Sequence, residues 1–292
     1  MTPVAIPADA AADNAARSGL KQRVLTALVL VPLLLAGIFL LPNIVWALLM
    51  CVPIALAALE WSRLAGYRRR GSRLFTVIVT ATCLGFIVLG ASAPPLPAGA
   101  AGAAEFIYVL ALLFWAIAVP AWLYFKWSVS QPLTLALTGW IVLVPAWLAI
   151  VSLQKSAGLL IIVLLTVWIA DIAAYFSGRR FGRRKLAPQI SPGKTWEGVF
   201  GAVAAVLIFG FIASFVLKSP ANIYDRMVTM IFVFALTVLG IVGDLFESWM
   251  KRGAGAKDSG SLLPGHGGVL DRIDSLTAAL PFAALYFLPA LR

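Results

Sequence analysis

Long apolar segments recur along the whole chain, and each is about long enough to cross a lipid bilayer as a helix, which takes roughly 20 residues. The nine segments are residues 24–41, 44–59, 74–91, 106–125, 133–153, 158–176, 199–217, 227–246 and 275–291. Hydrophobic residues make up 62% of the sequence and charged residues 12%, so the apolar surface exceeds what a core of this size can bury. The sequence therefore predicts an all-α, polytopic integral membrane protein with about nine transmembrane helices. It argues against a soluble enzyme and excludes a disordered chain.

These segments divide the chain into three parts. Residues 1–23 are rich in alanine and are expected to form a disordered cytoplasmic tail. Residues 24–153 would hold membrane helices one to five, and residues 154–292 would hold helices six to nine and form the catalytic region. This last part is expected to contain two long cytoplasmic loops, residues 177–198 and 247–274. Residues 92–104, rich in Ala, Pro and Gly, are interpreted as a connector.

Positive charge is distributed unevenly between the predicted helices. With a cytoplasmic N-terminus, 19 of the 23 Lys and Arg residues fall on the cytoplasmic side, as the positive-inside rule requires. All acidic residues except Glu105 and Asp225 fall on or near the same side, which membrane insertion does not demand. The sequence therefore predicts a polar site that faces the cytoplasm. Because topology accounts for the basic excess, no nucleic-acid partner is expected.

A polar stripe begins at the end of the eighth segment. Asp244, Glu247, Ser248 and Lys251 are spaced i, i+3, i+4 and i+7, which places them on one helix face. An ionisable residue inside a membrane helix indicates function by default, and Asp244 lies in such a position. The alternative is a solvated helix exit in which Lys251 pairs with Glu247.

A glycine-rich segment leads directly into the last apolar helix. Asp271 and Asp274 are spaced i, i+3 near the N-terminus of that helix. They could complement the helix dipole, or they could serve as the hard oxygen ligands that Mg²⁺ needs when it holds the phosphates of a nucleotide. Gly267 and Gly268 permit close approach of the backbone to an anion. The only histidine, His266, is interpreted as a hydrogen-bonding or loop-positioning residue, because a phosphate nucleophile is already ionised and needs no general base.

The sixth segment contains a carboxylate about 7.5 Å inside its apolar end, Asp171. Burying it without a partner would cost ~2.5 to 3.5 kcal/mol, so a cation such as Arg179 or Lys194 is expected beside it. Tyr175 lies one turn further on and is interpreted as an aromatic-belt residue.

Residues 191–198 resemble a P-loop only in Gly193, Lys194 and Thr195, because Pro188 stands at the first glycine position. Ser191 and Pro192 are expected to start a helix, with Lys194 free to contact an anionic substrate and Glu197 in the first turn. Plain helix capping is the alternative.

The polar segment after the eighth helix resembles the signature of the phosphatidate cytidylyltransferases, also called CDP-diacylglycerol synthases, without a departure over residues 248–274. The matching pattern is Ser248-x-Met250-Lys251-Arg252-x4-Lys257-Asp258-x-Gly260-x2-Leu263-Pro264-x-His266-Gly267-Gly268-Val269-x-Asp271-Arg272-Ile273-Asp274. Residues 171–182 and 191–198 also resemble blocks of this family.

The resemblance implies a membrane enzyme that makes CDP-diacylglycerol and pyrophosphate from CTP and phosphatidic acid. It implies Mg²⁺, a second cation for which K⁺ is a candidate, a homodimer, and an active site open to the cytoplasm and the lipid of the cytoplasmic membrane. The implied metal ligands are Asp244 and Asp271, and Lys194, Lys251 and Arg272 join them as the implied catalytic residues. The implied substrate-binding residues are Asp171, Tyr175, Ser191, Thr195, Glu197, Ser248, Arg252, Lys257, Asp258, His266, Gly267, Gly268 and Asp274.

Two other functions remain as alternatives. A CTP-dependent polyprenol kinase would share the membrane architecture but transfer the γ-phosphoryl group. A transporter would explain the spans and Asp171, but it would not explain so many polar residues in one cytoplasmic loop.

Overall fold

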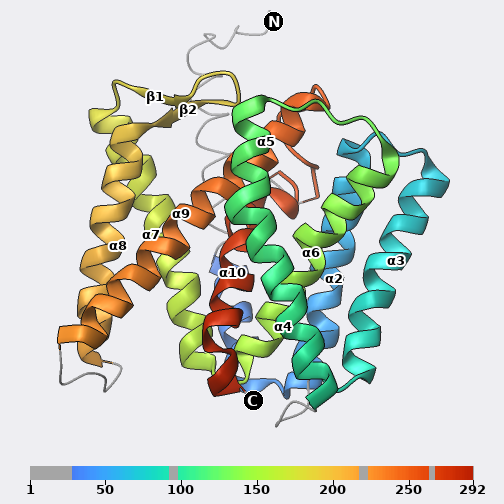
Figure 1. The fold of residues 1–292 in the computed structure, drawn as a ribbon, viewed down its shortest axis with the longest axis horizontal. Coiled ribbons are helices and arrows are strands. Elements are labelled where there is room, and N and C mark those ends of the chain that lie inside the picture. Colours follow the sequence, from blue (N-terminus) through green and yellow to red (C-terminus); the bar gives the residue numbers. More distant parts are fainter. Residues whose placement is uncertain (1–27, 92–97, 217–222, 263–266, 292) are drawn as a thin grey trace, which may run out of the picture.

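The computed structural model describes residues 28–91, 98–216, 223–262 and 267–291, and these residues form a bundle of helices with one small β-hairpin (Figure 1). The predicted tail, residues 1–23, and His266 lie outside the described residues. The all-α membrane class is confirmed, because seven of the described helices are long and apolar enough to cross a bilayer.

Each predicted apolar segment falls on a helix. A helix Leu28–Leu40 comes first. It is followed by α2 (Asn43–Leu64), α3 (Arg69–Val88), α4 (Ala98–Leu113), the π-helical η1 (Phe114–Ala118), α5 (Val119–Phe125), α6 (Pro132–Gln154), α7 (Ala157–Phe181), α8 (Trp196–Val216), α9 (Ile223–Gly253) and α10 (Leu270–Leu291). The strands β1 (Lys185–Ala187) and β2 (Ser191–Thr195) form the antiparallel hairpin between α7 and α8.

The expected connector, residues 92–104, is partly wrong. Residues 98–104 form the first turns of α4, where Ala100, Ala101 and Ala104 are buried. Alanine has the highest helix propensity, and its small side chain lets neighbouring helices approach. The π-helical η1 ends two residues before Pro120, whose ring does not fit a regular α-helical turn.

The expected cytoplasmic loops are also shorter than predicted. The helix α7 continues to Phe181 and α9 continues to Gly253. Both extensions carry basic residues in the last turn, Arg179 and Arg180 in α7 and Lys251 and Arg252 in α9. Cations there interact favourably with the helix dipole, so the helices extend beyond their apolar segments.

Packing between distant segments brings the last helix into the middle of the bundle. The helix α10 packs against α9 and also against α6 and α4 (Figure 1). A Cβ at Gly243 would come within 2.6 Å of the Asp274 carbonyl oxygen, so only glycine allows α9 and α10 to approach this closely next to Asp244.

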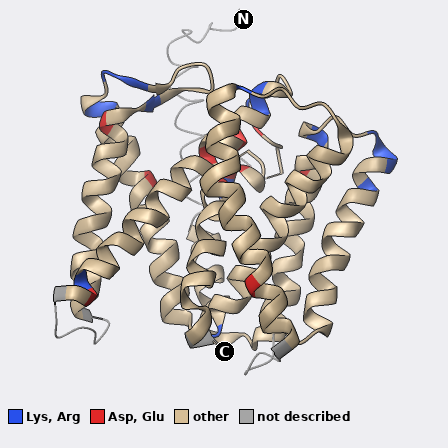
Figure 2. Cartoon of the chain, in the orientation of Figure 1, with Lys and Arg blue, Asp and Glu red and all other residues tan. Residues whose placement is uncertain are grey.

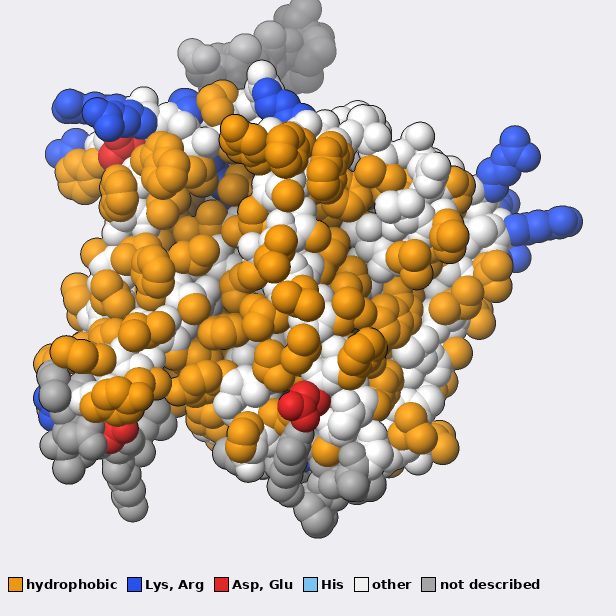
Figure 3. All heavy atoms as spheres, viewed as in Figure 1, with side chains coloured by type: hydrophobic (Ala, Val, Ile, Leu, Met, Phe, Trp, Pro, Cys, Tyr) orange, Lys and Arg blue, Asp and Glu red, His pale blue; other side chains and the backbone are white. Residues whose placement is uncertain are grey.

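Charged residues gather at one end of the bundle. The ends of α5, α7 and α9 and the hairpin lie there, and Figure 2 shows most of the Lys and Arg residues at this end. The sides of the bundle are largely apolar (Figure 3), and side chains such as Leu40, Val88 and Phe106 are exposed. Such an apolar belt is what a bilayer would cover.

Candidate active site

A pocket of about 570 Å³ opens between α7, α8, α9 and β2 near the basic end of the bundle. The predicted site residues that line it are Asp171, Tyr175, Ser191, Lys194, Thr195 and Asp244. Apolar side chains, among them Leu186, Val199 and Ile241, form much of the remaining wall. The pocket therefore combines a few charged groups with apolar walls.

The hairpin places Lys194 at this pocket, and it corrects the expectation that Ser191 and Pro192 start a helix. Both residues lie in β2, and α8 begins only at Trp196. Thr195 supplies the N-cap, because the Gly198 N–H donates to Thr195 Oγ1 at 3.2 Å. β2 pairs with β1 at its two ends, where Thr195 lies opposite Lys185 and Ser191 lies opposite Ala187.

Glu197 lies in the first turn of α8, as expected, but it does not line the pocket. Its carboxylate accepts backbone hydrogen bonds from Arg183 at 3.0 Å and Arg184 at 3.2 Å. Glu197 therefore ties the start of the hairpin to α8, a contact that holds β2 and Lys194 in place.

Asp244 lies at the centre of the polar face of α9. Lys194 Nζ is 2.5 Å from Asp244 Oδ2, and Ser248 Oγ donates to Asp244 Oδ1 at 3.4 Å. Asp171 on α7 is close enough to Asp244 for the two carboxylates to repel each other. The cations Lys194 and Arg272 attract the Asp171 carboxylate. The cations near Asp171 are therefore Lys194, as expected, and Arg272, whereas Arg179 donates to the Tyr175 hydroxyl at 3.0 Å instead.

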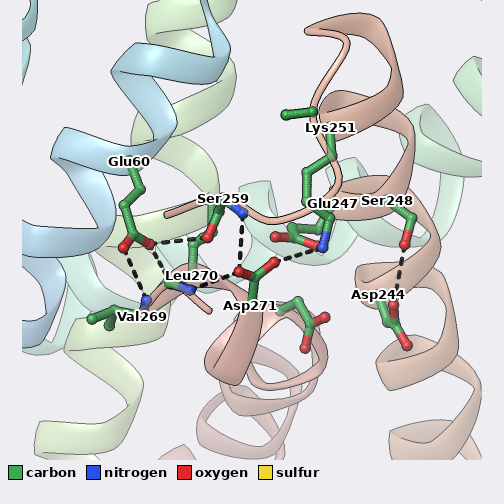
Figure 4. Close-up of polar contacts among 12 residues, drawn as sticks. Glu60, Asp244, Glu247, Ser248, Lys251, Ser259, Val269, Leu270 and Asp271 are labelled. Atoms are coloured by element: carbon green, nitrogen blue, oxygen red, sulfur yellow. Dashed lines mark hydrogen bonds and ion pairs between the residues drawn. The ribbon is translucent and has the colours of Figure 1, made fainter. Parts of the chain in front are cut away.

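Lys251 joins α9 to α10 through two carboxylates. It forms an ion pair with Glu247 one turn earlier, and its Nζ is 2.6 Å from Asp271 Oδ1. The Lys251 side chain is 11% exposed and both carboxylates are 5% exposed. The pairing of Lys251 with Glu247 is thus confirmed, but the interpretation as a solvated helix exit is wrong, because both side chains are largely buried and Lys251 also pairs with Asp271 of α10 (Figure 4).

Asp271 is held by the loop that precedes α10. The backbone N–H groups of Ser259 and Gly268 donate to Asp271 Oδ2 at 2.9 and 2.8 Å. Asp271 lies in the first turn of α10, as predicted, and Asp274 follows one turn later, close enough to Asp244 and Glu247 for electrostatic repulsion. The two predicted polar segments therefore meet at the α9–α10 contact.

Other predicted residues lie at the rim. Arg252, Lys257, Asp258 and Arg272 are exposed. Arg252 Nε donates to the Ile190 carbonyl at 3.3 Å, and its Nη1 donates to Ala256 at 3.0 Å. Arg252 thus links the end of α9 to the turn of the hairpin and forms part of the basic surface beside the pocket.

Sequence reasoning missed one buried carboxylate, Glu60 on α2. It accepts hydrogen bonds from Ser259 Oγ at 3.1 Å, from the Val269 N–H at 3.0 Å and from the Leu270 N–H at 2.8 Å (Figure 4). A signal was present, because Glu60 directly follows the apolar segment 44–59 and an ionisable residue at that depth indicates function.

The sequence is similar to those of known proteins over nearly its whole length. The sequence matches the Cytidylyltransferase family over residues 21–289. The phosphatidate cytidylyltransferase of Pseudomonas aeruginosa is 43% identical over 274 residues, which cover 91% of this chain and 96% of that protein. The phosphatidate cytidylyltransferase of Haemophilus influenzae is 36% identical over 286 residues, which cover 92% and 98%. The chain therefore belongs to the cytidylyltransferase family.

Proposed function

We propose that this protein transfers CMP from CTP to phosphatidic acid and releases CDP-diacylglycerol and pyrophosphate. The observation that carries the proposal is the Lys194–Asp244 ion pair in the wall of a largely apolar pocket at the basic end of a membrane bundle. The names of the relatives, which match nearly the whole chain, point to the same reaction.

The reaction joins two anions. A phosphate oxygen of the lipid attacks the α-phosphorus of CTP, a new P–O bond forms, and the bond to the β-phosphate breaks so that pyrophosphate leaves. Phosphoryl transfer of this kind depends on positioning and on neutralising charge. Lys194 and Lys251 pair with Asp244 and Asp271, and Arg252 and Arg272 lie at the exposed rim. Cations are therefore present both at the carboxylates and at the rim of the site.

The pocket also suits an amphipathic substrate. Leu186, Val199 and Ile241 give it apolar walls, while Lys194 supplies a cation that can bind a phosphate. The exposed Tyr175 and Phe176 continue the apolar surface along α7. A lipid could therefore keep its acyl chains on the apolar side and place its phosphate beside Lys194.

We propose that Asp244 and Asp271 hold Mg²⁺ together with the phosphates of CTP. Among the described residues, no three His, Cys, Asp or Glu side chains form a complete metal site. Mg²⁺ is usually bound by one or two carboxylates, water and substrate phosphates. The neighbouring carboxylates Asp171, Glu247 and Asp274 make the region acidic, so a divalent cation is favoured there. When bound, the ion would neutralise charge on the triphosphate.

The orientation of the site follows from the charge distribution. The hairpin and most basic residues lie at one end of the bundle (Figure 2), and residues of the hairpin line the pocket. By the positive-inside rule, we propose that this end faces the cytoplasm, where CTP is available.

Product analysis tests the proposed reaction. Purified protein given phosphatidic acid, CTP and Mg²⁺ should form CDP-diacylglycerol and pyrophosphate in equal amounts, and chelation of the metal should stop turnover. A polyprenol kinase would release CDP, and a transporter would consume no CTP, so either outcome would contradict the proposal.

Two variants test the metal ligands. Asp244→Asn and Asp271→Asn should each reduce turnover by more than the ~10 to 100-fold that is typical of residues behind the metal ligands. Glu105→Gln is the matched control, because it removes an exposed carboxylate that lies outside the pocket. Activity above about a tenth of wild type in either Asp variant would show that the residue does not bind the metal.

A further inference from the structure

Glu60 is a fully buried carboxylate in a helix of membrane-spanning length, with 0% of its surface exposed. A carboxylate in such an environment is costly unless hydrogen bonds satisfy its oxygens. Three donors do so, at distances of 2.8 to 3.1 Å. All three belong to residues 259–270, which are about 200 positions further along the chain.

These donors lie in or next to the residues that hold Asp271, which are Ser259 and Gly268. The N–H groups of Val269 and Leu270 belong to the start of α10, where backbone donors lack partners within the helix. Ser259 links the two carboxylates directly, because its hydroxyl donates to Glu60 and its backbone N–H donates to Asp271. A negative charge at this position also complements the dipole of α10.

Gly268 shows how closely the loop approaches Glu60. Its N–H donates to Asp271 Oδ2 at 2.8 Å, while a Cβ at this position would lie 2.5 and 2.6 Å from the two Glu60 oxygens. The loop can therefore reach both carboxylates only with glycine here.

The helix α2 is itself anchored next to Glu60. Trp61 Nε1 donates to the Leu135 carbonyl on α6 at 3.0 Å, and the Trp61 ring stacks on Phe246 of α9 with ring centroids 6.3 Å apart. Glu60 is therefore presented by a helix that is fixed to both the N-terminal bundle and the polar helix α9.

We propose that Glu60 is a positioning residue for the transfer reaction: it fixes the loop before α10 and thereby holds Asp271 where it faces Lys251. The role assigned to Asp271 rests on the proposed function, whereas the contact between Glu60 and the loop does not. The N-terminal half of the chain thus contributes to the site through one carboxylate.

Glu60→Gln is the most direct test. The glutamine side chain has nearly the same shape, but only one of its two terminal atoms accepts hydrogen bonds. Its NH₂ group would face the N–H of Val269 or Leu270, so at least one bond to α10 is lost. We expect kcat to fall ~10 to 100-fold, as for residues that orient a metal ligand, with little change in KM for phosphatidic acid.

Ser62→Ala provides the matched control. Ser62 is also fully buried on α2, and its hydroxyl lies 2.5 Å from that of Ser72 on α3. This variant removes a buried hydrogen bond from the same helix without touching the loop, so kcat should remain near wild type.

Hydrogen–deuterium exchange measures the loop itself and needs neither CTP nor metal. Peptides that cover Val269 and Leu270 should exchange faster in Glu60→Gln than in wild type, and at the wild-type rate in Ser62→Ala. Unchanged exchange in Glu60→Gln would overturn the proposal, and so would faster exchange with wild-type kcat. If Glu60→Gln does not fold, Ser259→Ala removes one of the three bonds and should shift exchange and kcat in the same direction. Failure of the proposed reaction would appear separately, in the products of the wild-type protein.

Discussion

Replacing Lys251 by methionine tests how the charges of the site are balanced. Methionine keeps much of the length of the side chain but removes the cation that Glu247 and Asp271 share. Asp271 would keep its two backbone donors. Glu247, however, has no ion-pair partner other than Lys251 among the described residues, and its carboxylate would remain buried without a counter-charge.

The expected cost follows from this difference. Removing one partner of a buried ion pair typically costs about 3 to 5 kcal/mol. Because 1 kcal/mol shifts the midpoint of thermal unfolding by ~2 to 4 °C in chains of 150 to 250 residues, Lys251→Met should unfold roughly 10 °C below wild type. Intrinsic tryptophan fluorescence of the detergent-solubilised protein would report the transition, since the chain has 10 Trp residues.

A second substitution separates the charge effect from lost packing. Lys251→Met combined with Glu247→Gln removes the orphaned charge, so most of the lost thermal stability should return. Turnover should remain abolished in both variants, because Lys251 is proposed to neutralise the phosphates. If the midpoint of thermal unfolding of the double variant is no higher than that of Lys251→Met, the lost stability comes from packing and the reasoning about charge is wrong.

Three further outcomes are expected. Gly268→Ala should abolish turnover, because its Cβ would lie 2.2 Å from Ser259 Oγ; wild-type activity would show that the loop can move away. Single cysteines in a background without the native ones test orientation: an impermeant thiol reagent applied outside intact cells should label Gly158→Cys but not Arg70→Cys, and the reverse pattern would invert the topology. Both positions are exposed, and a side chain at Gly158 meets no atom within 4 Å. Calorimetry should show that CTP and Mg²⁺ bind more tightly together than either does alone; tight binding of Mg²⁺ without nucleotide would contradict the pairing of Asp244 and Asp271 with lysines.

The helices and the polar face of α9 could be predicted because their signals are local. An apolar segment of membrane length identifies each span, and the spacing of Asp244, Glu247, Ser248 and Lys251 identifies a helix face. The helix α9 carries these residues together as expected. The resemblance of residues 248–274 to a known family pointed to Asp271, and this signal is also local because the whole pattern is contiguous in the sequence.

The hairpin and Glu60 depend on contacts that no local pattern shows. The strand β2 has only five residues and contains Pro192 and Gly193, so it lacks the alternation that predicts a strand. The partners of Glu60 lie 199 to 210 positions away. A sequence can mark Glu60 as unusual because it directly follows an apolar segment, but only the fold shows that the start of α10 is its partner.

The pairing of each proposed metal ligand with a lysine has a consequence for how substrates enter. Asp244 is paired with Lys194, and Asp271 with Lys251, so neither carboxylate is left as an isolated charge at the edge of an apolar region. If Mg²⁺ binds together with the triphosphate, Asp244 and Asp271 would hold the ion, and Lys194 and Lys251 would neutralise the phosphates. Each of these charged side chains would then exchange one partner for another. This exchange requires Asp271 to stay in place when Lys251 leaves it, and the bonds from Ser259 and Gly268, which Glu60 in turn supports, keep it there.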